Sequence, residues 1–140
     1  MTAAQLLALN ASLQILVSSI LGVLMLVPLQ PWARGWGQIL RSKGVTSTHL
    51  DWLMLAFMQT TAAFLLDRWP IPSDVAWTAA WLLVFGGWIN AVPYLLRSFG
   101  INAFVLAGPL HQRLWASVAG LSVLALVVGW GLILYHQVTT

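Results

Sequence analysis

Four long apolar windows, separated by short polar segments, constrain this chain more than any other feature of its sequence. A helix needs about 20 mostly apolar residues to cross the hydrocarbon core of a bilayer. Windows of about that length occupy residues 5–29, 48–66, 75–96 and 114–135. Backbone groups in lipid must be hydrogen-bonded within the protein, and the alternating pattern of a barrel is absent. Each window therefore predicts a membrane-spanning helix.

The composition supports the same class. Only 6% of the 140 residues are charged and 60% are hydrophobic, whereas soluble domains carry about 25% charged residues. So few charges could not cover the surface of a soluble protein. We therefore expect an all-α integral membrane protein: one transmembrane domain over residues 1–140, folded as a bundle of four transmembrane helices in the lipid bilayer.

Several classes of function are excluded or disfavoured by what the sequence lacks. The absence of cysteine excludes disulfides, zinc–thiolate sites, iron–sulfur clusters and cysteine nucleophiles. No basic run suggests a nucleic-acid partner, and the motifs of serine hydrolases, P-loop proteins and zinc proteases are missing. The chain has three Asp and no Glu, which argues against chemistry by paired carboxylates.

The basic residues predict the orientation. Five of the six lie in two loops, after the first window and before the fourth, and they are Arg34, Arg41, Lys43, Arg97 and Arg113. Arg68 lies in the short turn between the second and third windows. The positive-inside rule places the two longer loops in the cytoplasm and both termini outside, so we expect a multi-pass protein of the cell's inner membrane.

The nine tryptophans divide by depth. Six fall near window ends and are predicted to form an interfacial aromatic belt; they are Trp32, Trp36, Trp52, Trp69, Trp77 and Trp115. Trp81, Trp88 and Trp130 lie deeper and are predicted to pack between helices, with a ligand pocket as an alternative for Trp88.

Polar and small residues inside two windows predict helix contacts. In the first window they recur every four residues, along one helix face, as Asn10, Gln14, Ser18 and Gly22. This spacing indicates a helix–helix seam with interhelical hydrogen bonds. In the fourth window, the pair Ala116 and Gly120 is a second packing signal.

The second window begins with a polar run. Thr48 is predicted to cap the helix, with Asp51 at capping-box spacing. His49 has no such explanation: it could be an interfacial residue, or a neutral imidazole that binds a metal or haem. Gln59 and its neighbouring threonines can form hydrogen bonds within the bundle.

The third window carries Asn90 and Tyr94, four residues apart and therefore on one helix face. Gly86 and Gly87, about one turn earlier, leave room for a close neighbour or a ligand. Pro93 cannot donate to the carbonyl of residue 89 and predicts a kink.

The span order brings several of these groups to one depth. The second window begins at the predicted cytoplasmic side and the third ends there, so His49, Asn90, Tyr94 and Arg97 are expected at similar depth. This convergence predicts a binding site without naming its chemistry. His111 lies in the loop on the same side, and His136 ends the fourth window on the opposite side.

The chain resembles the styrene oxide isomerase family. The resemblance rests on four spans of like spacing, a histidine (His49) at the head of the second helix, and a GW-x-N-x-x-x-Y run at Gly87, Trp88, Asn90 and Tyr94. A Gly-Pro pair at 108–109 after the third helix also matches.

The resemblance implies a small membrane protein that binds haem b, assembles as a homotrimer and converts a small apolar epoxide into an aldehyde. It makes His49 the axial ligand of the haem iron, which acts as a Lewis acid. Tyr94 would orient the substrate and Asn90 would support the pocket. Two polar positions of the family differ here: an Asn on the second helix is Leu55, and an acid before the GW pair is Gly86. These departures put activity on the usual aryl epoxides in doubt.

Two other classes remain open from the sequence. A b-type electron carrier would hold haem between two side chains, with His111 as the candidate second ligand, because Met54 and Met58 lie on the helix of His49. A haem-free interaction or transport subunit would use the bundle without a cofactor.

Overall fold

The computed structural model describes residues 1–33 and 37–139, and every described element of regular structure is helical. The long helices are α1 (Ala3–Leu24), α2 (Lys43–Arg68), α3 (Ser73–Ile89) and α5 (Leu110–Thr139), and α4 (Val92–Arg97) is short. Three 3-10 turns, η1 (Val27–Leu29), η2 (Pro31–Ala33) and η3 (Gln38–Arg41), follow α1. The predictions for Arg34 and Trp36 fall outside the described residues.

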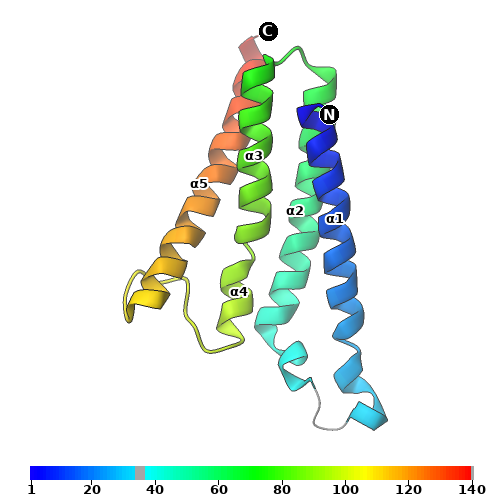
Figure 1. Ribbon diagram of the computed structural model, residues 1–140, viewed down its shortest axis with the longest axis vertical. Helices are drawn as coiled ribbons and strands as arrows, with labels where there is room; N and C mark the ends of the chain where they lie inside the picture. Colours follow the sequence, from blue (N-terminus) through cyan, green and yellow to red (C-terminus); the bar gives the residue numbers. More distant parts are fainter. Residues whose placement is uncertain (34–36, 140) are drawn as a thin grey trace.

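The helices form an elongated up-and-down bundle (Figure 1). Both termini and the short α2–α3 turn lie at one end, and the two longer loops lie at the other. Toward the loop end, α5 diverges from α3 and α4. The all-α prediction is confirmed, and the two longer loops share one end of the molecule as their basic residues suggest.

Three of the described helical stretches are long and apolar enough to cross a membrane: Ala3–Leu29, Ser73–Arg97 and Leu110–Thr139. The fourth long helix, α2, has 26 residues, so by length it also suffices. Its composition is more polar, but the polar side chains in its central part have hydrogen-bond partners. Gln59 is 2% exposed, and the outward-facing Thr60 and Thr61 each donate a hydrogen bond to a carbonyl one turn back, at 3.0 Å.

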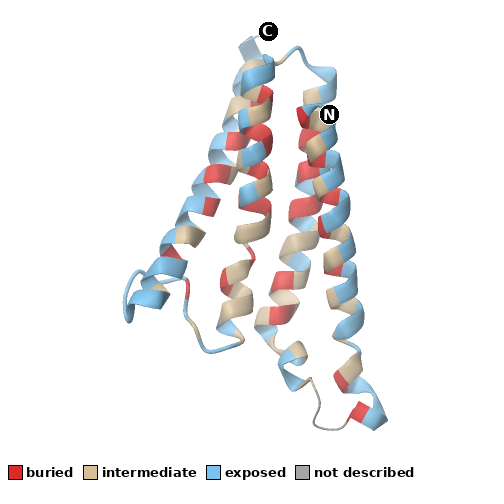
Figure 2. Ribbon diagram, viewed as in Figure 1, coloured by how far each residue is buried: buried red, intermediate tan, exposed pale blue. Residues whose placement is uncertain are grey.

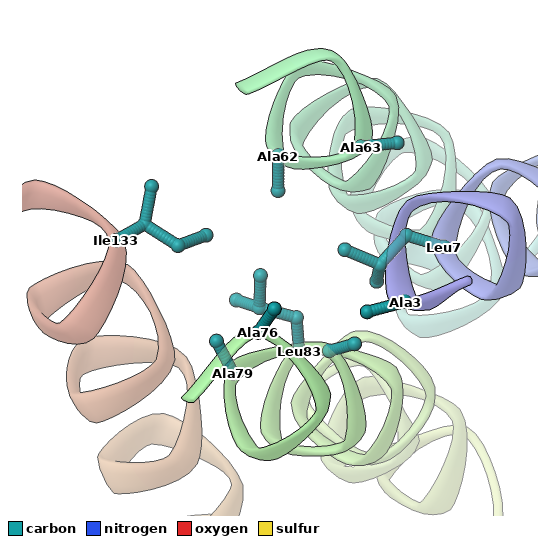
Figure 3. Close-up of a cluster of buried hydrophobic side chains, with 9 residues drawn as sticks. Ala3, Leu7, Ala62, Ala63, Ala76, Ala79, Leu83 and Ile133 are labelled. Atoms are coloured by element: carbon teal, nitrogen blue, oxygen red, sulfur yellow. The ribbon is translucent and has the colours of Figure 1, made fainter. Parts of the chain in front are cut away.

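Buried side chains gather on the facing sides of the helices, and exposed ones cover the outside (Figure 2). At the terminus end, small alanines from α1, α2 and α3 meet around Leu7, Leu83 and Ile133 (Figure 3). Small side chains allow the helix backbones to approach closely, which is how helices associate in lipid.

Glycines mark the contact between α3 and α5. A Cβ at Gly86 would lie 2.5 Å from Leu126 Cγ, and one at Gly129 would lie 3.0 Å from Leu83 Cγ. By contrast, a Cβ at Gly120 would meet nothing within 4 Å. Of the predicted pair, Ala116 is buried, but Gly120 makes no close helix contact within one chain; Gly86 and Gly129 make that contact instead.

The start of α2 corrects one prediction. Ser42, not Thr48, is the N-cap: its hydroxyl accepts a hydrogen bond from the Val45 N–H at 3.3 Å. Thr48 lies inside the helix and donates to the Gly44 carbonyl at 2.9 Å. The helix begins five residues before the apolar window. Hydropathy marks the part of a helix that faces lipid, whereas the backbone hydrogen bonds of α2 extend beyond that part. Asp51 is therefore two turns into the helix and caps nothing.

The third span is broken, as Pro93 predicts. α3 ends at Ile89, and α4 begins at Val92 with Pro93 in its first turn. Proline has no N–H to continue the ladder of helix hydrogen bonds. Across the break, the hydroxyl of Thr48 on α2 reaches the Ala91 carbonyl at 3.4 Å.

Candidate functional site

His49 lies in the second turn of α2 and faces α1. Its Nδ1 is 2.8 Å from the Ser18 carbonyl oxygen, and the Ser18 hydroxyl in turn donates to the His49 carbonyl at 2.7 Å. A carbonyl oxygen only accepts hydrogen bonds, so Nδ1 must carry the imidazole proton. In the neutral imidazole, Nε2 then keeps its lone pair, which is the arrangement of a histidine that ligates a metal.

Gly22 makes room for this imidazole. A Cβ at Gly22 would lie 2.9 Å from Cε1 of His49 and 3.4 Å from Nε2. The predicted seam residues Ser18 and Gly22 therefore do more than pack two helices together. Ser18 sets the tautomer of the half-buried His49, and Gly22 leaves the space that its ring occupies.

A chain of amide hydrogen bonds runs through the centre of the bundle. The Trp88 indole donates to Asn10 Oδ1 at 2.9 Å, and the Asn10 amide donates to Gln59. Gln59 donates to Gln14 at 2.9 Å, and Gln14 donates to the Gly87 carbonyl at 2.5 Å. The chain starts and ends on adjacent residues of α3, so it joins α1, α2 and α3 and confirms the predicted polar seam.

This network explains the Gly-Trp pair of the third helix. A Cβ at Gly87 would collide with the Gln59 amide, so only glycine admits the network. The Trp88 carbonyl also accepts a hydrogen bond from the Trp52 indole at 3.1 Å. The half-buried Trp52 therefore ties α2 to α3, and Trp88 has a structural role.

The other deep tryptophans differ from each other. Trp130 packs against the apolar core, and its indole N–H is buried without a partner among the described residues. Trp81 is 57% exposed, so the prediction that it packs between helices of one chain is wrong. Helix periodicity places it on the outer face of α3, away from Ala79 and Leu83.

Asn90 and Tyr94 lie at the break between α3 and α4. The Asn90 amide donates to Oδ2 of Asp51 on α2 at 3.2 Å. The Tyr94 ring meets Phe104, from the loop before α5, edge to face with centroids 5.0 Å apart. Both residues line a cavity of about 380 Å³ between α4, this loop and α5, and its other walls include Pro93 and Gly120.

The predicted gathering of His49, Asn90, Tyr94 and Arg97 in one site is therefore found only in part. The cavity brings Asn90 and Tyr94 together, and Tyr94 and Arg97 line a second cavity. His49 stays at the same end of the bundle but makes its contacts with α1. His111 is exposed in the first turn of α5, and the described residues hold no cluster of three or more metal-binding side chains.

The predicted hydrogen bonding of Gln59 within the bundle is confirmed, but sequence reasoning missed Asp51 as an interhelical partner of Asn90. Thr48, Trp52, Leu55 and Gln59 follow one another at spacings of four, three and four residues, which is the signature of one helix face. That stripe carries the contacts of Thr48, Trp52 and Gln59 with α1 and the third span, and it could have been found from the spacing alone.

The two residues that depart from the family pattern, Leu55 and Gly86, both lie in tightly packed positions. Leu55 is 4% exposed. At Gly86, a Cβ would overlap Leu126 and lie 3.0 Å from the Ser122 carbonyl oxygen of α5. An acidic side chain there would require α5 to move, so α3 and α5 approach more closely here than an acid would allow.

Comparison with known proteins identifies the family. The family model of styrene oxide isomerase matches residues 3–138, which is nearly the whole chain. No match to the chain was found among curated proteins or solved structures. The matched range includes every helix described above except Thr139, the last residue of α5, together with His49 and the Gly87–Tyr94 run, and the chain therefore belongs to the styrene oxide isomerase family.

Proposed function

We propose that this protein is a haem b-dependent epoxide isomerase that converts a small apolar epoxide into an aldehyde. The observation that carries the proposal is the state of His49 in a chain that belongs to this family. Nδ1 is held protonated by the Ser18 carbonyl at 2.8 Å, so Nε2 is the nitrogen that can bind iron. An interfacial histidine with no ligand role would not need this fixed tautomer.

The residues present fit a haem ligand. The imidazole is held by a backbone carbonyl, which orients a ligating ring and raises its basicity. Haem bound through His49 would supply a Lewis acid for the epoxide oxygen. The reaction is an internal rearrangement: one C–O bond of the ring breaks, a hydride moves to the neighbouring carbon, and a C=O bond forms. It needs no oxidant or reductant.

Tyr94 and Asn90 would position the substrate. A cavity of about 380 Å³ falls within the usual range of about 300–1,000 Å³ for small-molecule sites. Its remaining walls are mostly apolar, including Pro93, Phe104 and Val123, and would exclude water that could open the epoxide to a diol. The Tyr94 hydroxyl would orient the epoxide, and Asp51 fixes the Asn90 amide through a 3.2 Å hydrogen bond.

The proposal includes the homotrimer and the membrane location that the family resemblance implies. His49 contacts α1, whereas Asn90 and Tyr94 line the cavity beside α5. A site that used all three groups on one substrate would therefore draw on neighbouring copies. The outer faces, with exposed side chains such as Leu9, Phe57 and Trp81, offer apolar surface for lipid and for such contacts. We place the chain in the inner membrane, with the longer loops cytoplasmic.

An absorbance spectrum of the detergent-purified protein, oxidised and reduced, tests this function. We expect a strong Soret band that is lost in His49→Ala and kept in His136→Ala, a histidine at the opposite end. Full haem occupancy in His49→Ala would end the ligand assignment. A colourless protein that takes up no added haem would remove the mechanism and favour a haem-free interaction or transport subunit.

His111→Ala separates the isomerase from an electron carrier. An isomerase has an open coordination position, so the spectrum should shift with carbon monoxide and be unchanged by His111→Ala. A spectrum that resists carbon monoxide in the parent protein, but responds after His111→Ala, would identify His111 as a second ligand and the protein as a carrier.

A further inference from the structure

A second cavity, of about 480 Å³, lies at the loop end where α2 begins and α4 ends (Figure 1). It is chemically different from the cavity beside α5. Two cations, Lys43 and Arg97, line it together with three serine hydroxyls and Tyr94; the serines are Ser42, Ser47 and Ser98. These groups are cations or hydrogen-bond donors at pH 7, and none is an acid.

The walls of this cavity are fixed to each other. The Ser42 hydroxyl donates to the Ser98 hydroxyl at 2.7 Å, which ties the first residue before α2 to the residue after α4. Gly44 has no side chain, and a Cβ there would overlap Ser98 and the Tyr94 carbonyl. The two helix ends therefore meet by close backbone approach, and the exposed side chains of Lys43 and Arg97 line the same cavity.

Neither cation has a carboxylate partner among the described residues. The sequence has only three acids. Asp67 and Asp74 flank the turn at the opposite end of the bundle. Asp51 is eight residues beyond Lys43 on α2, about 12 Å along the helix axis, and it accepts a hydrogen bond from Asn90. Two like charges on one cavity repel each other unless an anion joins them.

The N-terminus of α2 also favours the binding of an anion at this cavity. The first N–H groups of a helix have no partner within it, and the helix dipole favours an anion there. Ser42 accepts one of them, from Val45. Basic pockets between membrane helices on the cytoplasmic side are suited to anionic lipid headgroups, and the positive-inside rule puts this end of the bundle on that side.

We propose that this cavity is a binding site for a phosphate group, carried by the headgroup of an anionic phospholipid in the surrounding leaflet. Lys43 and Arg97 bind the phosphate oxygens from α2 and α4, and the hydroxyls of Ser47 and Ser98 complete the hydrogen bonds. Because α4 also carries Tyr94, an occupied headgroup site holds the short helix against the start of α2. His49, which contacts α1, does not line this headgroup site.

Native mass spectrometry of the detergent-purified protein tests this site. The protein is delipidated and then titrated with phosphatidylglycerol or phosphatidylcholine. We expect phosphatidylglycerol to be retained and phosphatidylcholine to be lost. In the double variant Lys43→Gln/Arg97→Gln, phosphatidylglycerol should bind about a hundredfold more weakly, because two charge-assisted contacts are lost and each contributes roughly a factor of ten. Equal retention of the two lipids, or no effect of the double variant, would overturn the proposal.

Matched variants separate this cavity from general charge and from haem. Arg41→Gln removes one cation from the same end without touching the cavity lining, and Lys43→Arg keeps the charge; both should retain phosphatidylglycerol. His49→Ala should also retain it, and loss there would assign the anion to the haem pocket and refute a separate site. If inorganic phosphate raises the melting temperature as much as phosphatidylglycerol, with the same dependence on Lys43 and Arg97, the source of the phosphate is soluble.

Discussion

At the scale of single residues, the candidate haem ligand is defined by its neighbour. The Ser18 backbone carbonyl fixes the protonated nitrogen of His49 at 2.8 Å, and Gly22 leaves space for the ring. A backbone carbonyl is present whatever side chain residue 18 carries, so the tautomer survives substitution of Ser18 and depends on the rotation of α1 against α2. The sequence predicts the seam at Ser18 and Gly22, but it does not predict that His49 faces it.

Gly22→Ala should therefore disturb the ligand specifically. The new Cβ would stand 2.9 Å from Cε1 of His49, and overpacking of this kind costs about 1–3 kcal/mol. We expect a lower melting temperature and weaker haem retention, measured by tryptophan fluorescence and the Soret band. Gly120→Ala is the control, because a Cβ there meets nothing within 4 Å. Equal effects of the two variants would contradict the packing described for His49.

Tyr94→Phe tests the substrate role. The ring contact with Phe104 needs only the aromatic ring, so folding and haem content should be unchanged. Turnover of an aryl epoxide, followed by aldehyde formation, should fall by about two- to tenfold if the hydroxyl orients the substrate, since losing one such hydrogen bond costs about 0.5–1.5 kcal/mol. Unchanged turnover would remove Tyr94 from the mechanism. Phe104→Leu, which keeps the hydroxyl, is the comparison.

At the scale of elements, α2 carries most of the polar contacts and was the hardest helix to predict. Its apolar window marks only part of its length, since Ser42 caps it well before Thr48. The break at Pro93 was predictable because proline lacks an N–H. The partners of Asn10 and Gln14 were not, because the position of Gln59 opposite them depends on how two helices are rotated about their axes.

Gln59→Leu should destabilise the bundle because it leaves buried amide groups without a hydrogen-bond partner. Gln59 is 2% exposed, and the Asn10 and Gln14 amides that it joins would lose their partner. An unsatisfied buried polar group costs about 1–3 kcal/mol. We expect a clear loss of stability in a thermal or SDS unfolding series. Thr61→Ala on the same helix removes only an outward hydroxyl that bonds within its own helix, and it should be nearly neutral; a comparable loss there would contradict the role of the network.

At the scale of the whole molecule, the arrangement of ends follows from the order of helices. The termini and the α2–α3 turn share one end, and both longer loops share the other. The composition and the apolar windows predict this layout. They do not predict that α5 diverges at the loop end, because that depends on where Gly86 and Gly129 let the backbones meet.

The orientation can be measured cleanly because the chain has no cysteine. A single cysteine in the turn, Ser73→Cys, should react in intact cells with a maleimide that cannot cross the membrane. Ala107→Cys, in the loop before α5, should react only after permeabilisation. The positive-inside rule predicts these two labelling outcomes. Labelling of Ala107→Cys but not Ser73→Cys in intact cells would reverse the topology.

The chain of amide hydrogen bonds among α1, α2 and α3 has a consequence for the biosynthesis of the protein. All its donors and acceptors lie on residues 10–88, so they are synthesised before α5 leaves the ribosome. The nascent chain can satisfy its costliest polar groups while the last helix is still absent. α5 then packs against the assembled helices through apolar side chains such as Ile133 and through the close contacts at Gly86 and Gly129, and a chain truncated before Leu110 should still insert without exposing unpaired amides to lipid.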